Sequence, residues 1–171
     1  TITSSPEEAA EYIQRGELAV FPTETVYGLG ADALNLDAVE AIFRAKGRPS
    51  DNPLIVHLAD RSDLGTVAAT VTSAAENLLE AFTPGPLTLV LPRAAALSDR
   101  VTAGLDTVGV RIPSLPIARA FLRACETPVA APSANRSGRP SPTTWRAAYE
   151  DLVGRVPCIL QGGRTDAGIE S

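Results

Sequence analysis

The sequence is poor in the residues that build several common kinds of site. Its 171 residues include one histidine, two cysteines, one tryptophan and no methionine. The cysteines, Cys125 and Cys158, lie far apart in the chain, unlike the close pairs of zinc sites and thiol redox motifs. We expect two buried, reduced thiols, with a disulfide as the alternative.

An excess of positive charge and a long apolar segment are also missing. The chain has 15 Lys and Arg against 20 Asp and Glu, a net charge of −5. This balance argues against a non-specific nucleic-acid coat, although a small basic cleft is compatible with an acidic surface. No apolar run approaches the roughly 20 residues that span a membrane, and residues 1–20 lack a signal-peptide pattern. We therefore expect a cytoplasmic protein with no membrane association.

The usual nucleotide-binding fingerprints are absent or out of place. No Gly-Lys-Ser/Thr of a Walker A motif occurs. Residues 28–33 match Gly-x-Gly-x-x-Ala, but a dinucleotide site needs this motif between a strand and the helix that follows directly. Here Pro22 ends the preceding strand too early, and the next helix starts only near Asp37. Any ATP must therefore be bound in another way.

The composition is that of one folded domain. The apolar content is 44% and the mean hydropathy is +0.06, and the length suffices for a core. Helical and strand-like segments alternate unevenly, and proline ends most strands, which favours an α/β domain with a mixed sheet. We assign residues 1–171 to this domain. Because the chain starts without Met and stops in mid-pattern at Ser171, we expect a domain trimmed at its ends.

Capping residues and apolar periodicity predict the elements. Ser5 and Glu8 form a capping box for a helix that reaches Arg15, and Asp37 caps another. We expect a loop over residues 23–36. Further predicted helices cover residues 60–71, 72–82, 115–126 and 143–152, and predicted strands cover 18–21, 53–58, 87–91, 107–112, 128–131 and 156–160.

Two turns place polar side chains beside apolar strands. Lys46 and Arg48 combine a point charge with a planar fork, which suits a polyphosphate; a solvated helix C-terminus is the alternative. Ser133 and Asn135 offer a hydroxyl and an amide for hydrogen bonds to a ligand. A Ser–His triad with His57 is disfavoured, because no Gly-x-Ser-x-Gly turn surrounds Ser133.

Three further segments are open to two interpretations. Thr23 and Tyr27 either line a small-molecule pocket or belong to a loop that satisfies its own amides. His57, on a strand, is either a hydrogen-bonded structural residue or part of a cleft. Arg111 lies in an apolar strand, so it must pair with an internal acid or with a bound carboxylate or phosphate.

Six segments in this order resemble the YrdC family, whose members make threonylcarbamoyl-AMP for tRNA modification. They read FPTETVYGLG, KGRPSDNPLIVH, PGPLTLVL, VGVRIP, APSANRSGRPSPT and GGRTDAGIES. The resemblance implies a YrdC-like α/β fold, with a twisted mixed sheet and flanking helices around a concave, positively charged cavity. It implies a reaction of L-threonine, bicarbonate and ATP, with Mg²⁺ accompanying the ATP.

The resemblance also implies roles for individual residues. Nucleotide-binding positions fall on Lys46, Arg48, Ser133 and Asn135, of which Lys46 and Arg48 are catalytic. Positions for L-threonine fall on Thr23, Tyr27, His57, Arg111 and Ser171. The implied downstream partner is a tRNA threonylcarbamoyl transferase complex, with tRNA itself a further candidate.

Two alternatives remain. One is a carbamoyladenylate-forming domain that uses carbamoyl phosphate; its relatives carry extra cysteine-rich or transferase modules, and none is visible here. The other is a non-catalytic RNA-binding module, which the acidic charge and the lack of interleaved aromatic and basic residues disfavour.

Overall fold

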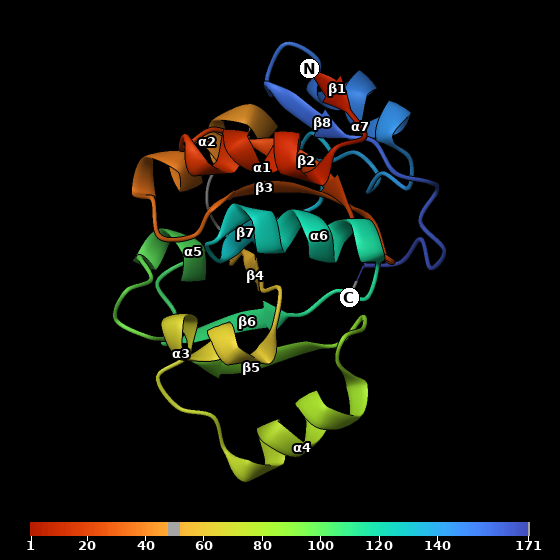
Figure 1. Cartoon of the computed structure of the whole chain (residues 1–171). Helices are drawn as coiled ribbons and strands as arrows, with labels where there is room; N and C mark the ends of the chain where they lie inside the picture. Colours follow the sequence, from red (N-terminus) through yellow and green to blue (C-terminus); the bar gives the residue numbers. More distant parts are fainter. Residues whose placement is uncertain (48–51, 171) are drawn as a thin grey trace.

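An eight-stranded, twisted mixed sheet is the frame of the molecule (Figure 1). The computed structural model describes residues 1–47 and 52–170. The strands are β1 (Ile2–Thr3), β2 (Ala19–Pro22), β3 (Tyr27–Asp32), β4 (Ile55–His57), β5 (Thr88–Pro92), β6 (Thr107–Arg111), β7 (Val129–Ala131) and β8 (Cys158–Leu160). Their order in the sheet is β1-β8-β2-β3-β7-β4-β6-β5. The predicted α/β class with a mixed sheet is confirmed.

The sheet contains both parallel and antiparallel pairs. β8 pairs in parallel with β1 and β2, and β4 pairs in parallel with β6. β3 is antiparallel to β2 and β7, β4 is antiparallel to β7, and β5 is antiparallel to β6. The centre of the sheet therefore brings together β3, β7, β4 and β6, which come from distant parts of the chain.

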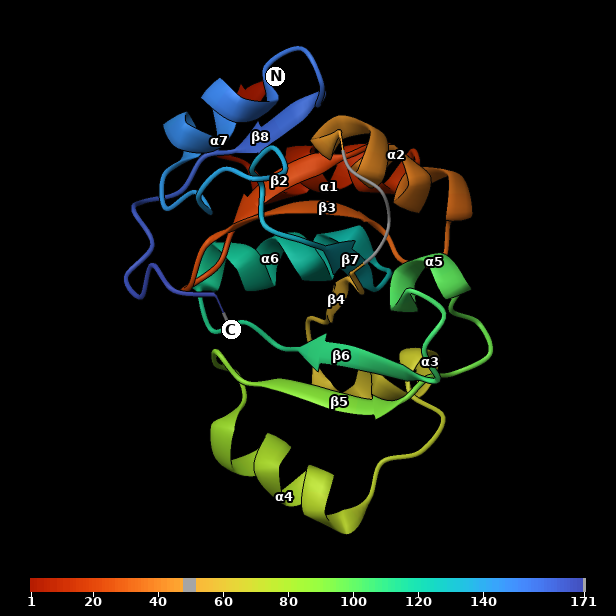
Figure 2. The ribbon, with the colours of Figure 1, turned by 180° about the vertical axis from the view of Figure 1, so that it is seen from behind.

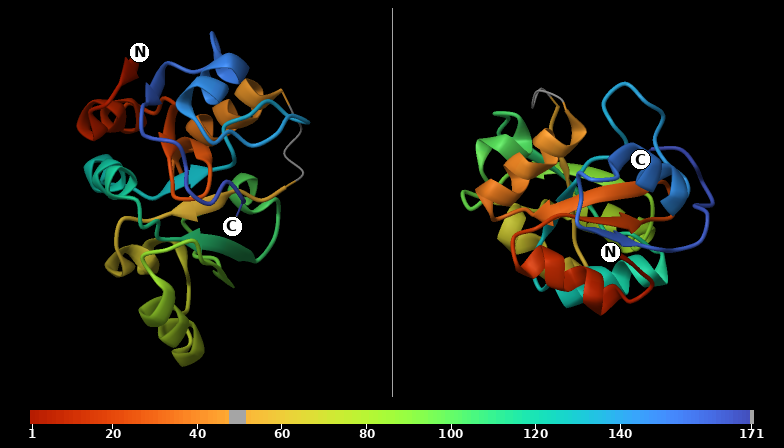
Figure 3. Two further views of the ribbon diagram at one scale, coloured as in Figure 1. Left: turned by 90° about the vertical axis from the view of Figure 1, so that its right-hand side faces the viewer. Right: turned by 90° about the horizontal axis from the view of Figure 1, so that it is seen from above.

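Helices cover both faces of the sheet. They are α1 (Pro6–Gln14), α2 (Leu36–Lys46), a 3₁₀ turn (Arg61–Asp63), α3 (Leu64–Val67), α4 (Ser73–Phe82), α5 (Asp99–Thr102), α6 (Pro116–Cys125) and α7 (Trp145–Leu152). α1 and α6 pack side by side on one face, while α2 and α7 lie on the other (Figures 2 and 3). Each described helix is too short or too polar to cross a membrane.

Helix starts follow local capping chemistry. The Ser5 side chain accepts a hydrogen bond from the Glu8 amide at 3.2 Å, as predicted. The Glu8 carboxylate, however, is bonded to the Thr3 hydroxyl, so the reciprocal half of the capping box is not formed with Ser5. The start of α2 was also placed wrongly, because Asn35 caps this helix by accepting from the Ala38 amide at 3.2 Å.

Two element predictions were wrong. The expected loop over residues 23–36 contains β3, in which Gly28 and Gly30 lower the strand signal. The expected helix over residues 60–71 is a 3₁₀ turn followed by the single turn of α3, because Ala68 leaves the helix to form a bridge with Arg93. Strand pairing overrides the helical pattern there.

Both cysteines are buried and free, as expected. Burial raises the pKa of both thiols, that of Cys158 to about 11, so both are protonated near neutral pH. They belong to the apolar layer between the sheet and the α1–α6 pair, where the Phe21 and Phe121 rings stack with centroids 4.9 Å apart.

Candidate active site

A cavity of about 210 Å³ opens over the centre of the sheet. Its walls come from the β2–β3 loop, β4, the end of β6, the segment after β7 and the C-terminal segment, which returns to the middle of the sheet (Figure 3). The described lining residues are Thr23, Thr25, Val26, Gly28, Asn52, Pro53, Ile55, His57, Arg111, Ala131, Pro132, Ser133 and Glu170. Four predicted site residues therefore meet in one cavity: Thr23, His57, Arg111 and Ser133.

The β2–β3 loop is a tight turn and a cavity wall at once. The Thr23 hydroxyl donates to the Val26 carbonyl at 2.7 Å and accepts from the amides of Thr25 and Val26 at 3.2 and 3.3 Å. Its oxygen lies 3.0 Å from the Thr25 hydroxyl oxygen. Thr23 therefore fits both interpretations of this loop, since it lines the cavity and also satisfies the loop's own backbone.

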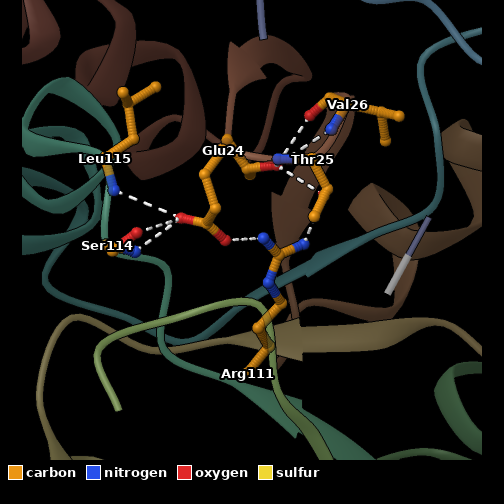
Figure 4. Close-up of polar contacts among 7 residues, drawn as sticks. Glu24, Thr25, Val26, Arg111, Ser114 and Leu115 are labelled. Carbon is orange, nitrogen blue, oxygen red and sulfur yellow. Dashed lines mark hydrogen bonds and ion pairs between the residues drawn. The ribbon is translucent and has the colours of Figure 1, made fainter. Parts of the chain in front are cut away.

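Arg111 pairs with an internal acid. Its Nη2 forms an ion pair with Oε1 of Glu24, and its Nη1 donates to the Thr25 hydroxyl at 2.8 Å (Figure 4). The other oxygen of Glu24 accepts from the Ser114 amide at 2.6 Å, the Ser114 hydroxyl at 2.8 Å and the Leu115 amide at 3.2 Å. The structure therefore supports the internal salt bridge and still leaves the Arg111 side chain at the cavity wall.

The electrostatics of this pair follow from its burial. The Arg111 side chain is 3% exposed and that of Glu24 is 14% exposed. Burial lowers the pKa of Arg111 to about 10, which leaves the guanidinium charged at neutral pH. A buried cation of this kind requires a compensating carboxylate, and Glu24 supplies it.

Lys46 lies directly behind the Ser133 segment. It is 2% exposed at the end of α2, and its Nζ donates to the Ser133 carbonyl and, at 3.5 Å, to Oδ1 of Asn135. Asn135 donates in turn to the carbonyls of Arg136 and Arg139 at 2.9 and 2.7 Å. The structure thus joins Lys46, Ser133 and Asn135 across a long sequence separation, and Ser133 is the one of them that lines the cavity.

His57 is a buried, neutral residue at the cavity wall. It is 5% exposed, its Nδ1 lies 3.1 Å from the Ile55 carbonyl, and its ring is edge-on to Phe21. Burial lowers its pKa to about 4, against a smaller opposing effect of backbone hydrogen bonds at Ile55 and Val129. At neutral pH the imidazole is therefore uncharged.

Tyr27 stands behind the cavity and does not line it. Its ring is fully buried, and its hydroxyl donates to the Gly163 carbonyl and accepts from the Gly162 amide, both at 3.0 Å. Burial raises the pKa of this phenol, so it stays protonated. Tyr27 is placed to fix the C-terminal segment, whose residues Ala167 and Gly168 also donate to the Glu24 and Thr25 carbonyls at 3.1 Å.

Some site residues remain predictions, and others were not identified from the sequence. Arg48 and Ser171 lie outside the described residues, so their roles and the positive charge of the cavity stay predictions. Three residues at or beside the cavity were not identified in this way: Thr25, Glu24 and Glu170. The sequence indicated that Arg111 needs an anion, but Glu24 is remote from it in sequence, and no local pattern identified Glu24 as the partner.

The described residues suit a magnesium ion that arrives with a nucleotide. They contain no group of three or more His, Cys, Asp or Glu side chains that could hold a metal alone. Among the described lining residues, Glu170 is the one carboxylate, and its Oε1 contacts the Ser141 hydroxyl. Mg²⁺ is commonly held by one or two carboxylates together with substrate phosphates, and Glu170 can supply one such carboxylate.

Comparisons with known proteins identify the family. The Sua5_yciO_yrdC family model, described as telomere recombination, matches residues 11–171. A threonylcarbamoyl-AMP synthase of Pyrococcus abyssi is 52% identical over 163 residues, covering 95% of this chain and 48% of the relative. A threonylcarbamoyl-AMP synthase of Bacillus subtilis is 52% identical over 172 residues, covering 99% of this chain and 50% of the relative.

A solved structure shares the fold almost throughout. P. abyssi Sua5 complexed with L-threonine matches with a TM-score of 0.95 and 51% identity, covering 97% of this chain and 49% of that one. The chain thus spans about half the length of these relatives. The match of the family model over nearly all residues, together with this agreement of sequence and fold, shows that the chain belongs to the Sua5/YciO/YrdC family.

Proposed function

We propose that this chain carries out threonylcarbamoyl-AMP synthesis, releasing pyrophosphate from ATP in a reaction with L-threonine and bicarbonate. The observation that carries the proposal is the cavity over the sheet centre, which gathers Thr23, His57, Arg111 and Ser133 in a chain 52% identical to synthases of this name. The likeness to Sua5 complexed with L-threonine supports L-threonine as the amino-acid substrate.

The chemistry needs two bond-forming steps in a protected space. The amine of L-threonine attacks CO₂ with loss of a proton, or bicarbonate with loss of water, to give a carbamate, which is unstable in water. A carboxylate oxygen of the carbamate then attacks the α-phosphorus of ATP, and pyrophosphate leaves. A cavity closed by the β2–β3 loop and the C-terminal segment would exclude water from the intermediate, and catalysis would depend on positioning and electrostatics.

The proposed roles divide between the two ends of the cavity. Lys46, Arg48, Ser133 and Asn135 would bind the nucleotide, with Lys46 and Arg48 neutralising charge on the leaving pyrophosphate. Lys46 would also support the nucleotide-binding residues by fixing the backbone of the Ser133 segment from behind. Thr23, His57, Arg111 and Ser171 would line the L-threonine end, and Tyr27 would hold the C-terminal segment against it.

Mg²⁺ would enter with ATP, and Glu170 is the described carboxylate placed to meet it. When bound, the ion would supply charge neutralisation at the phosphates. Because the adenylate is an activated donor, the product would pass to an acceptor, for which we propose a tRNA threonylcarbamoyl transferase complex.

Product analysis tests this proposal. The chain is incubated with ATP, Mg²⁺, L-threonine and ¹³C-labelled bicarbonate, and the quenched mixture is analysed by mass spectrometry. We expect threonylcarbamoyl-AMP that carries one ¹³C atom. In a parallel reaction with carbamoyl phosphate and ATP, an adenylate that does not form from bicarbonate would favour the carbamoyladenylate alternative. RNA binding without any adenylate would favour the binding module.

A further inference from the structure

One carboxylate, that of Glu24, joins two parts of the cavity wall, the β2–β3 loop and the end of β6, to the segment before α6. It belongs to the β2–β3 loop, pairs with Arg111 at the end of β6 and accepts three hydrogen bonds from Ser114 and Leu115 at the start of α6 (Figure 4). The backbone carbonyl of the same residue accepts from the Ala167 amide of the C-terminal segment at 3.1 Å. Displacement of Glu24 would therefore move several walls together.

The ion pair also sets the orientation of the threonine hydroxyls in the loop. Arg111 donates to the Thr25 hydroxyl at 2.8 Å, so the hydrogen of Thr25 is left to point at Thr23, 3.0 Å away. The Thr23 hydroxyl donates in turn to the Val26 carbonyl at 2.7 Å. The donors thus run in one direction, from the guanidinium into the loop, and this direction depends on where Glu24 holds Arg111.

Glu24 also offsets the positive charge of Arg111 at the cavity wall. A lone buried guanidinium at the cavity wall would attract any phosphate that enters. With Glu24 in contact, the pair is neutral as a unit. The wall formed by β6 then offers directed polar groups without a net positive charge.

We propose that Glu24 is a positioning residue that fixes the Arg111–Thr25 wall and cancels the charge of Arg111, so that this wall adds no net attraction for phosphate. Only the expected effect of Glu24 on turnover rests on the proposed function; its expected effect on pyrophosphate binding does not. Phosphate binding is then left to residues on other walls, and pyrophosphate can leave without being retained at Arg111.

Binding of inorganic pyrophosphate, measured by calorimetry without turnover, tests the charge cancellation. Glu24→Gln removes one negative charge beside the guanidinium, and we expect pyrophosphate to bind at least about fivefold more tightly than in the wild type. The double variant Glu24→Gln/Arg111→Met removes both charges, so we expect it to fold even where the single variant does not. It should bind pyrophosphate within about twofold of the wild type.

Matched variants separate positioning from general stability. Glu40→Gln breaks another glutamate–arginine pair, that of Glu40 with Arg100 on α2 and α5, and should change neither binding nor turnover. Glu24→Asp keeps the charge but shortens the reach. It should bind pyrophosphate as the wild type does while kcat falls by about tenfold or more, because the wall is displaced.

Two results would overturn the proposal. If the double variant loses pyrophosphate affinity by about tenfold or more, Arg111 itself attracts the phosphates. If Glu24→Gln folds, melts at a lower temperature and leaves pyrophosphate affinity and kcat unchanged, Glu24 is only a structural residue. Because Glu24→Gln should gain affinity even in a chain that makes no adenylate, failure of the synthesis and failure of this proposal are separate results.

Discussion

At the scale of single residues, His57 shows how burial sets the chemistry of the cavity wall. The imidazole is nearly inaccessible; its Nδ1 lies near the Ile55 carbonyl, and its ring is almost perpendicular to that of Phe21. Burial lowers its pKa from 6.5 to about 4. Because the unfolded chain binds a proton near pH 6.5 and the folded chain only near pH 4, protons favour the unfolded state between these values.

We therefore predict that His57 contributes to acid destabilisation. The free energy of unfolding should fall as the pH is lowered from about 6.5 to 4, by up to about 3 kcal/mol from this residue alone, and level off below pH 4. His57→Gln should lose this part of the slope. Urea denaturation at several pH values measures it, and identical slopes in the two proteins would contradict the assigned burial effect.

Lys46, the only lysine of the chain, gives a second prediction at this scale. Lys46→Ala removes the donor to the Ser133 carbonyl and to Asn135 Oδ1, so the Ser133 segment loses its support. Pyrophosphate release should fall by on the order of 10²-fold or more. Arg44→Ala, an exposed cation one half-turn away on α2, is the control and should retain most of the activity. Equal turnover in wild type and Lys46→Ala would remove Lys46 from the site.

Residue chemistry predicted part of this site and left part of it open. The apolar strand around Arg111 indicated that this residue needs an anion, but charge alone did not single out Glu24, because any of the 20 acids could fold back to it. The pairing of Lys46 with Ser133 and Asn135 depends on the end of α2 meeting the segment after β7. Such meetings are set by the topology of the sheet and not by local sequence.

At the scale of elements, β3 is the instructive case. Its two glycines suggested a loop, yet one of them, Gly30, is what allows the strand to pack. A Cβ atom at Gly30 would lie 2.9 Å from Val129 Cγ1 and 3.0 Å from Phe21 Cε1. Gly28 has no such conflict below 3.3 Å and lines the cavity instead. Close approach of neighbouring side chains thus explains a composition that propensity assigned to a turn.

This packing predicts a difference between two glycine substitutions. Gly30→Ala should lower the free energy of unfolding by about 1–3 kcal/mol, because the buried strands have no room for a methyl group. Gly65→Ala, in α3, meets no atom within 4 Å and should be neutral or slightly stabilising. Chemical denaturation of both variants gives the comparison, and equal losses would argue against the packing role of Gly30.

The C-terminal segment gives a further prediction at this scale. Tyr27→Phe removes the hydroxyl that binds the Gly162 amide and the Gly163 carbonyl, at a cost of about 1–2 kcal/mol. Amide exchange at Gly162 should become faster, since its donor loses its acceptor. Tyr149→Phe, on the half-exposed side chain of α7, should change stability by no more than about 0.5 kcal/mol. Unchanged exchange at Gly162 would mean that other contacts hold the segment.

At the scale of the whole molecule, the mixed sheet explains why distant motifs act together. The sequence pattern predicted alternating strands and helices, and most of them occur within a few residues of the expected bounds. The order β3-β7-β4-β6 at the sheet centre could not be predicted from local patterns, because each of these pairs joins segments separated by other elements. That order alone brings Thr23, His57, Arg111 and Ser133 to one cavity.

The most direct measurement is pyrophosphate release from ATP by this chain, with and without L-threonine and with and without bicarbonate. The proposed synthesis predicts release only when both are present, because the carbamate that attacks ATP needs both. Release that does not depend on L-threonine and bicarbonate, or no release from a chain that binds ATP and L-threonine, would contradict it.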